Sequence, residues 1–324
     1  MNPDFPTASN AGPPLERGYP WYAPRRFQHR YGRHLLLFLV TFATTTIAGA
    51  FAHAGFQETA GGFDQSTLWS VGFFASGLWY SIPILLILGA HEFGHYALCR
   101  IHQVDATLPY FIPAPPVLLI TGTLGAVIRI REAFPSRRAL FDIGVAGPIA
   151  GFIVLLPLLY WGVTLSEVVL ITPDEGVIYF GEPLLYQFAA WLHFGSIPDG
   201  YDVSIHPMAF AAWWGMLATA LNLLPFGQLD GGHIVYSLFR GHRHAVMVSI
   251  ATLIAAALLT TRSLSWISML VVMVIMALVL GLRHPQVIDE DTPLDARRRL
   301  VAAFALAMFL LCFTPVPIQT FIGR

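Results

Sequence analysis

Residues 81–95 of this chain read SIPILLILGAHEFGH, an apolar run that ends directly in three ionisable side chains. The run belongs to a longer apolar stretch, residues 69–98, and similar stretches recur along the chain. Of the 324 residues, 56% are hydrophobic and 11% are charged, whereas typical soluble domains carry about 25% charged residues. A chain so poor in charge cannot cover a globular surface with polar groups, so the composition predicts a protein that lies mostly in lipid.

Several segments are apolar enough to be membrane-spanning helices, which need about 20 mostly apolar residues. They are residues 34–52, 76–101, 141–165, 207–226, 245–260, 265–282 and 299–316. Pro83 and neighbouring glycines predict either a break in the second segment or an additional half-buried piece near 66–76. Because two segments are short, the sequence predicts an all-α polytopic membrane protein with six or seven transmembrane helices.

The placement of arginine orients these helices. If the N-terminus is cytoplasmic, alternate loops collect sixteen of the 18 basic residues on the cytoplasmic side, as the positive-inside rule expects. The loop 166–206 on the other side carries six acidic residues and no arginine. We therefore expect a cytoplasmic tail at 1–33 and one transmembrane domain at 34–324. With no targeting signal evident, this asymmetry fits a bacterial inner membrane, and an organellar membrane is the alternative. The net charge of −1 gives no basic field for nucleic acid.

Residues 107–130 fit neither a plain helix nor a plain loop. They are apolar but contain four prolines, which break helices, and Val127, Ile128 and Ile130 favour strands. Non-helical backbone at membrane depth is tolerated only inside protein or beside a water-filled cavity. The pattern predicts a re-entrant β-hairpin or loop near the active site; the alternative is a loop lying on the lipid headgroups. Residues 183–195 are expected to form a short interfacial helix.

The ionisable end of the opening run has the pattern H-E-x-x-H. On a helix, His91 and His95 share a face one turn apart, so both imidazoles can bind one metal ion. Glu92 then lies where it can take a proton from an attacking water. Ionisable groups inside spanning segments are costly and usually functional. A structural alternative needs two neutral histidines and a carboxylate satisfied by other helices.

A second polar signal is NLLPFGQLDGGH at residues 222–233, which follows another apolar segment on the same side. A catalytic zinc commonly takes three protein ligands and keeps one position open, and Asp230 is the natural third ligand. Pro225 and Gly227 would end the helix and let the carboxylate approach the metal. Cys99, one turn beyond His95, is interpreted as a small buried thiol; a fourth-ligand role is the alternative.

Together these motifs resemble the site-2 protease family of intramembrane zinc metalloproteases. The resemblance rests on H-E-F-G-H, on N-x-x-P-x-x-x-L-D-G, on GTLGAVIRI and on DIGVAGP at 142–148, and it covers roughly residues 70–285. It implies one Zn²⁺ per chain held by His91, His95 and Asp230. It also implies that Glu92 is the catalytic base and that Asn222 helps to orient the substrate. Many bacterial members insert a PDZ domain, but no stretch here is large enough for one.

The predicted function is hydrolysis of peptide bonds in or near the transmembrane helices of membrane-anchored proteins. Such a helix must unwind before attack, and an edge strand within 119–130 that includes Gly125 could pair with the extended substrate. Two alternatives stay open. A metal-ion transporter would also place His, Glu and Asp at membrane depth, but transporters often have repeated halves, and no repeat is evident. An inactive homologue that binds helices would have no need for Glu92.

Overall fold

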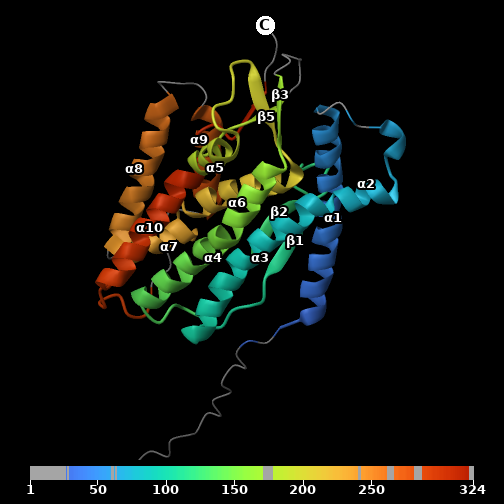
Figure 1. Cartoon of the computed structure of the whole chain (residues 1–324). Helices are drawn as coiled ribbons and strands as arrows, with labels where there is room; N and C mark the ends of the chain where they lie inside the picture. Colours follow the sequence, from blue (N-terminus) through green and yellow to red (C-terminus); the bar gives the residue numbers. More distant parts are fainter. Residues whose placement is uncertain are drawn as a thin grey trace, which may run out of the picture.

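The computed structural model describes residues 27, 29–59, 62, 64–170, 178–239, 242–260, 266–280 and 287–320. Most of this part of the chain is helical (Figure 1). The predicted cytoplasmic tail lies largely outside the described residues. The helices are α1 (Tyr31–Thr59), α2 (Val71–Ser76), α3 (Leu78–Ile101), α4 (Arg137–Thr164), α5 (Leu184–Phe194), α6 (Pro207–Asn222), α7 (Asp230–Phe239), α8 (His242–Thr260), α9 (Ile267–Leu280) and α10 (Ala296–Cys312), with a short 3₁₀ helix at Gln65–Thr67. The strands are β1 (Tyr110–Pro113), β2 (Thr123–Val127), β3 (Glu167–Leu170), β4 (Ile178–Phe180), β5 (Tyr201–Ser204) and β6 (Ile318–Thr320).

Within the described residues, four helical stretches are long and apolar enough to cross a membrane. They are Tyr31–Thr59, Val71–Ile101, Arg137–Thr164 and Arg243–Thr260. Helices α6, α9 and α10 are apolar but have 16, 14 and 17 residues, below the usual spanning length of about 20. The prediction of a helical membrane protein is therefore confirmed in outline, whereas the number of six or seven spans is not confirmed.

The long second stretch is interrupted at Gly77, between α2 and α3, and not at Pro83, which lies inside α3. Gly77 packs against the backbone of α1 so closely that a Cβ there would lie 2.0 Å from the Thr46 carbonyl oxygen. The segment before it forms the short helix α2. A break at a neighbouring glycine and an additional short piece are therefore both observed, whereas Pro83 does not interrupt the helix.

Helices α3, α4 and α6 form the centre of the molecule, with α4 packed against both of the others. Small residues allow this closeness: a Cβ at Gly94 of α3 would lie 2.5 Å from the Ala146 carbonyl oxygen of α4, and one at Gly162 of α4 would lie 2.3 Å from the Ala209 nitrogen of α6. Fully buried Leu155 of α4 and Met216 of α6 belong to the main hydrophobic core. The apolar helices thus form one packed body around α4.

Residues 107–130 form the predicted β-hairpin. Strand β1 pairs antiparallel with β2, with Tyr110 opposite Val127 and a register shift at Ile112/Pro113. β1 packs against α1, and β2 contacts α3. Gly125 in β2 has a φ of +104°, a conformation that other residues rarely adopt. The depth of this hairpin in a membrane stays a prediction.

The remaining strands form two small antiparallel pairs, β3 with β5 and β4 with β6. β3 and β5 lie at the top of Figure 1, at the end of the molecule where α1 finishes and opposite the end where it begins. Helix α5 occupies Leu184–Phe194, where a short helix was predicted; its interfacial position stays a prediction.

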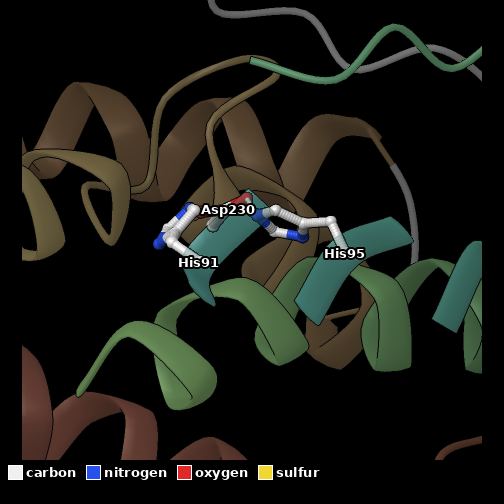
Figure 2. Close-up of side chains that lie close together, drawn as sticks. All are labelled: His91, His95 and Asp230. Atoms are coloured by element: carbon white, nitrogen blue, oxygen red, sulfur yellow. Dashed lines mark hydrogen bonds and ion pairs between the residues drawn. The ribbon is translucent and has the colours of Figure 1, made fainter. Parts of the chain in front are cut away.

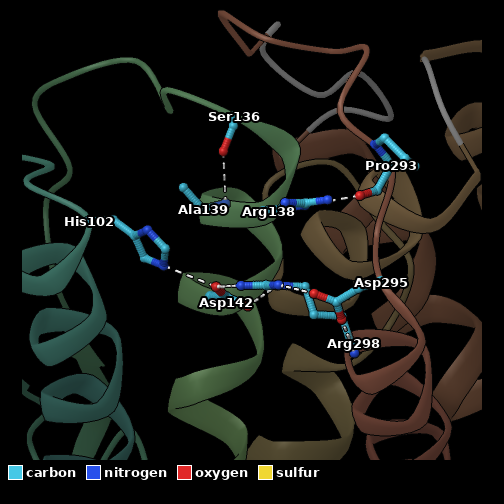
Figure 3. Close-up of polar contacts among 8 residues, drawn as sticks. All are labelled: His102, Ser136, Arg138, Ala139, Asp142, Pro293, Asp295 and Arg298. Carbon is cyan, nitrogen blue, oxygen red and sulfur yellow. Dashed lines mark hydrogen bonds and ion pairs between the residues drawn. The ribbon is translucent and has the colours of Figure 1, made fainter.

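A polar cluster, which we call the Asp142 clamp, joins three helices at their arginine-rich ends (Figure 3). Arg298 of α10 donates from Nε to Asp142 Oδ1 of α4 at 2.7 Å and from Nη2 to Oδ2 at 2.6 Å. His102, which caps α3, contacts Asp142 Oδ2 through Nε2 at 3.0 Å. Asp295 accepts from Arg298 as well. The bidentate geometry, the stronger form of an arginine–carboxylate pair, holds α10 against α4.

Candidate metal centre

His91 and His95 project from the same face of α3 toward Asp230, the first residue of α7 (Figure 2). All three side chains are buried, and their ligand atoms lie within 4.8 Å of one another. The turn between α6 and α7 brings Asp230 back to α3, as predicted from Pro225 and Gly227, and Gly227 has a positive φ of 45°. The structure therefore brings together the three residues that the sequence singled out as ligands.

The distances among these atoms test whether a metal ion fits. His91 Nε2 and His95 Nε2 are 3.1 Å apart, and they lie 3.2 Å and 3.3 Å from the two Asp230 carboxylate oxygens. A tetrahedral ion bound at about 2.0–2.1 Å separates its ligand atoms by about 3.3 Å. The spacing and the chemistry of the donor set thus fit one tetrahedral zinc ion with one position left open.

The orientation of the His95 imidazole also fits metal binding. Its Nδ1 lies 2.7 Å from the Ile143 carbonyl oxygen of α4, and a carbonyl can only accept, so Nδ1 carries the proton. Nε2 then keeps its lone pair for a metal, the usual arrangement for a ligating histidine. Asn222, at the end of α6, places Nδ2 3.4 Å from His91 Nε2.

Helix α4 forms the floor of the site through glycines. A Cβ at Gly147 would lie 2.1 Å from His95 Nε2, and one at Gly151 would lie 3.2 Å from His91 Cβ. The absence of side chains at these two positions allows α3 to pack closely against α4 at the site. Gly147 in particular provides the space that the His95 imidazole occupies.

Glu92 is buried beside the ligands, with 7% of its surface exposed. The backbone N–H of Ile128, just beyond β2, interacts electrostatically with its carboxylate. The hairpin strand and the candidate base therefore meet at the site. Cys99 is fully buried in a different cluster, with Val104 and Leu140, and is absent from the ligand group found in the described residues.

Sequence reasoning missed two backbone groups that interact with the site, the Ile143 carbonyl and the Ile128 N–H. It also missed Arg298 as the partner of Asp142, outside the metal centre. The two backbone groups leave no mark on residue type. The only signal for the clamp was Asp142 in an otherwise apolar segment, which calls for a basic partner.

Comparisons with known proteins agree with this geometry. The family model described as Peptidase family M50 matches residues 79–261. The chain is 32% identical over 197 residues to "Probable zinc metalloprotease EGY2, chloroplastic" of Arabidopsis thaliana, covering 59% of this chain and 34% of that protein. It is 33% identical over 165 residues to "Probable zinc metalloprotease EGY1, chloroplastic" of the same plant, covering 48% and 28%. The matches thus span about a third of the length of these relatives.

Proposed function

The chain belongs to peptidase family M50, the family of the site-2 proteases, and on this premise we propose that it is an intramembrane zinc metalloprotease. It hydrolyses peptide bonds in or near the transmembrane helices of membrane-anchored proteins. The observation that carries this proposal is the buried group of His91, His95 and Asp230 with Glu92 beside it. A purely structural cluster would not need a free carboxylate next to three converging ligand atoms.

His91, His95 and Asp230 hold the metal, which when bound lowers the pKa of a water and polarises the scissile carbonyl. Glu92 accepts the proton of the attacking water and passes it to the leaving amine. The Nδ2 group of Asn222, which lies next to the ligands, can donate to the carbonyl oxygen as negative charge develops there. The glycines of α4 fix both imidazoles in position, so the ligands need little rearrangement.

The hairpin is the proposed support for the substrate. β1 and β2 form a two-stranded sheet in the described part of the chain, so each strand has an edge without a further strand. β2 leads to Ile128, whose backbone interacts electrostatically with Glu92. An extended segment paired with β2 by β-augmentation would therefore run directly to the catalytic base.

The first experiment compares the natural protein with Glu92→Gln, using zinc content and cleavage of a single-span substrate in detergent. We expect equal zinc content and loss of cleavage in the variant, because glutamine cannot accept the proton. If neither protein cleaves any helical substrate while both hold zinc, the proposal fails. A metal-ion transporter or an inactive helix-binding homologue is then the better explanation of the site.

A second experiment tests the hairpin. Gly125→Pro removes an N–H that donates to Thr123 Oγ1 at 3.0 Å and cannot adopt the positive φ at this position, so cleavage should be abolished with zinc intact. Gly125→Ala keeps the N–H and meets no atom within 4 Å of its Cβ, so it should lose less. Unchanged cleavage by the proline variant would remove the hairpin from the proposal.

The protein is membrane-integral, with the spanning helices described above. The comparisons give no support for a bacterial inner membrane or for a cytoplasmic N-terminus. The relatives are named chloroplastic, which favours the organellar alternative. We propose that the arginine-rich ends of the helices, including the Asp142 clamp, face the side from which the chain was inserted.

A further inference from the structure

A cavity of about 1250 Å³ lies at the end of the molecule away from the arginine-rich ends. Its walls come from the second half of α1, the turn of the hairpin, β3, β4, β5 and the first turns of α6. Of the elements that form its walls, β3, β5 and the second half of α1 lie at the top of Figure 1. No function described so far uses this space.

The cavity is acidic. Glu58, Glu167, Glu182 and Asp202 line it, and none of the described residues that line it is basic. Glu182 is exposed, and partial desolvation, and after it the neighbouring Asp202 carboxylate, raise its pKa. A carboxylate whose charge is opposed by a second carboxylate is stabilised by a cation.

An independent observation is the hydroxyl group of Tyr186. The side chain is only 2% exposed, yet it lines the cavity, and no hydrogen bond of the described residues involves its Oη. The hydroxyl is accessible from the cavity and can donate or accept there. The phenol therefore offers a hydrogen bond to something that enters the cavity.

Aromatic side chains decide which kind of cation fits. Phe180, Phe210 and Trp213 form part of the wall, and their rings pack together with centroids 5.1 Å apart in two of the pairs. Aromatic faces bind the alkyl stem and charged head of lysine or arginine. A divalent metal ion needs oxygen ligands on all sides, and the aromatic part of the wall offers none.

Helix α6 connects the cavity with the metal centre. Phe210 lines the cavity, and Asn222, twelve positions later, lies beside His91. At 1.5 Å rise per residue, the two ends are about 18 Å apart. An extended peptide covers about 18 Å in five or six residues.

We propose that this cavity binds a lysine or arginine side chain of the substrate, five or six residues outward from the scissile bond. The inference rests on the proposed protease function and names the substrate class: membrane-anchored proteins with a basic residue just outside the span. Basic residues are scarce on that side of membrane proteins, so such a requirement would select few substrates.

The test uses the full-length chain and a single-span substrate with neutral outer residues, into which one lysine is placed at successive positions. Lysine at the fifth or sixth position should raise kcat/KM about tenfold over glutamine at the same position, a size typical of a partly desolvated charge pair. Glu182→Gln combined with Asp202→Asn should remove this preference and leave cleavage of the neutral substrate unchanged. Tyr186→Phe should reduce it. Asp199→Asn, an acidic residue of the same loop outside the cavity lining, is the matched control and should keep it.

The outcomes separate the two proposals. If the neutral substrate is cleaved but lysine gives no advantage at any position, or the preference survives the double variant, the inference is overturned and the protease function stands. If no substrate is cleaved, the protease function itself fails. If added Ca²⁺ stimulates cleavage of the neutral substrate through Glu182 and Asp202, the cavity is a metal site and the inference is wrong. Zinc content equal to that of the natural protein shows that each variant is folded.

Discussion

Replacing Gly147 with alanine should displace a metal ligand although no metal-binding residue is itself substituted. The new Cβ would lie 2.1 Å from His95 Nε2 and 2.5 Å from Cδ2 and Cε1, whereas ordinary contacts begin at 3.4 Å. The imidazole must therefore move by at least about 1 Å, while metal–ligand distances in a working site vary by only about 0.2 Å. The clash could also be relieved by moving α3 away from α4, but this would open the close contact between Gly94 and Ala146 in the same helix interface.

We expect the zinc affinity of Gly147→Ala to fall by roughly 100-fold, the upper range for losing the support of a ligand, and cleavage to fall at least as much. The assay is zinc retention during titration with a chelator, followed by cleavage of the single-span substrate at saturating zinc. Two matched variants show whether the loss of zinc affinity follows the closeness of the new Cβ to a ligand. Gly151→Ala meets His91 Cβ at 3.2 Å and should lose less, and Gly55→Ala meets nothing within 4 Å and should lose nothing. Full zinc retention and normal cleavage by Gly147→Ala would refute the argument that α4 sets the position of His95.

Three further outcomes follow from the described contacts. Asn222→Ala should keep zinc but lower kcat by roughly 10²–10³-fold, the usual cost of removing one oxyanion donor; an unchanged kcat would leave Asn222 a packing residue. Arg298→Ala should lower the free energy of unfolding in detergent by about 1–3 kcal/mol, because charged hydrogen bonds to Asp142 are lost, whereas the exposed Arg299→Ala should change it little. The preference for a lysine-bearing substrate should weaken on acidification at a higher pH than an ordinary glutamate would give, because the pKa of Glu182 is raised and its charge is lost sooner as pH falls. A kcat/KM ratio for lysine and glutamine substrates that stays constant down to the usual pKa of glutamate would contradict that cause.

The ligand residues could be predicted from the sequence because the geometry of His91 and His95 is local: one helical turn separates them, whatever the rest of the fold does. Asp230 was predicted from the second polar motif and from the number of ligands that a catalytic zinc takes, and the resemblance implied it as well. Where its carboxylate points depends on the turn between two helices. The Ile143 carbonyl could not be predicted, because it depends on how α3 and α4 cross. The same holds for Arg298, whose partner Asp142 lies 156 positions away.

The positions of the helices also show which features are local and which depend on contacts between helices. Among the described residues, apolar composition located the long helices, but helix ends and breaks depended on contacts between helices. Pro83 lost only local hydrogen bonding and α3 continued through it, whereas close approach to the Thr46 carbonyl coincides with the break at Gly77. The hairpin was predictable because prolines excluded a helix and β-branched residues favoured strands. Its register shift at Ile112/Pro113 was not.

The division of the metal centre between α3 and α7 also has a consequence during synthesis of the chain. Asp230 is made 135 positions after His95, and at about 5–20 residues per second this takes roughly 7–27 seconds. Through that interval the two histidines are already in place while the third ligand does not yet exist. The centre can close only after α1 to α6 have been synthesised, so under the proposed function the nascent chain could not hydrolyse neighbouring membrane proteins before that point.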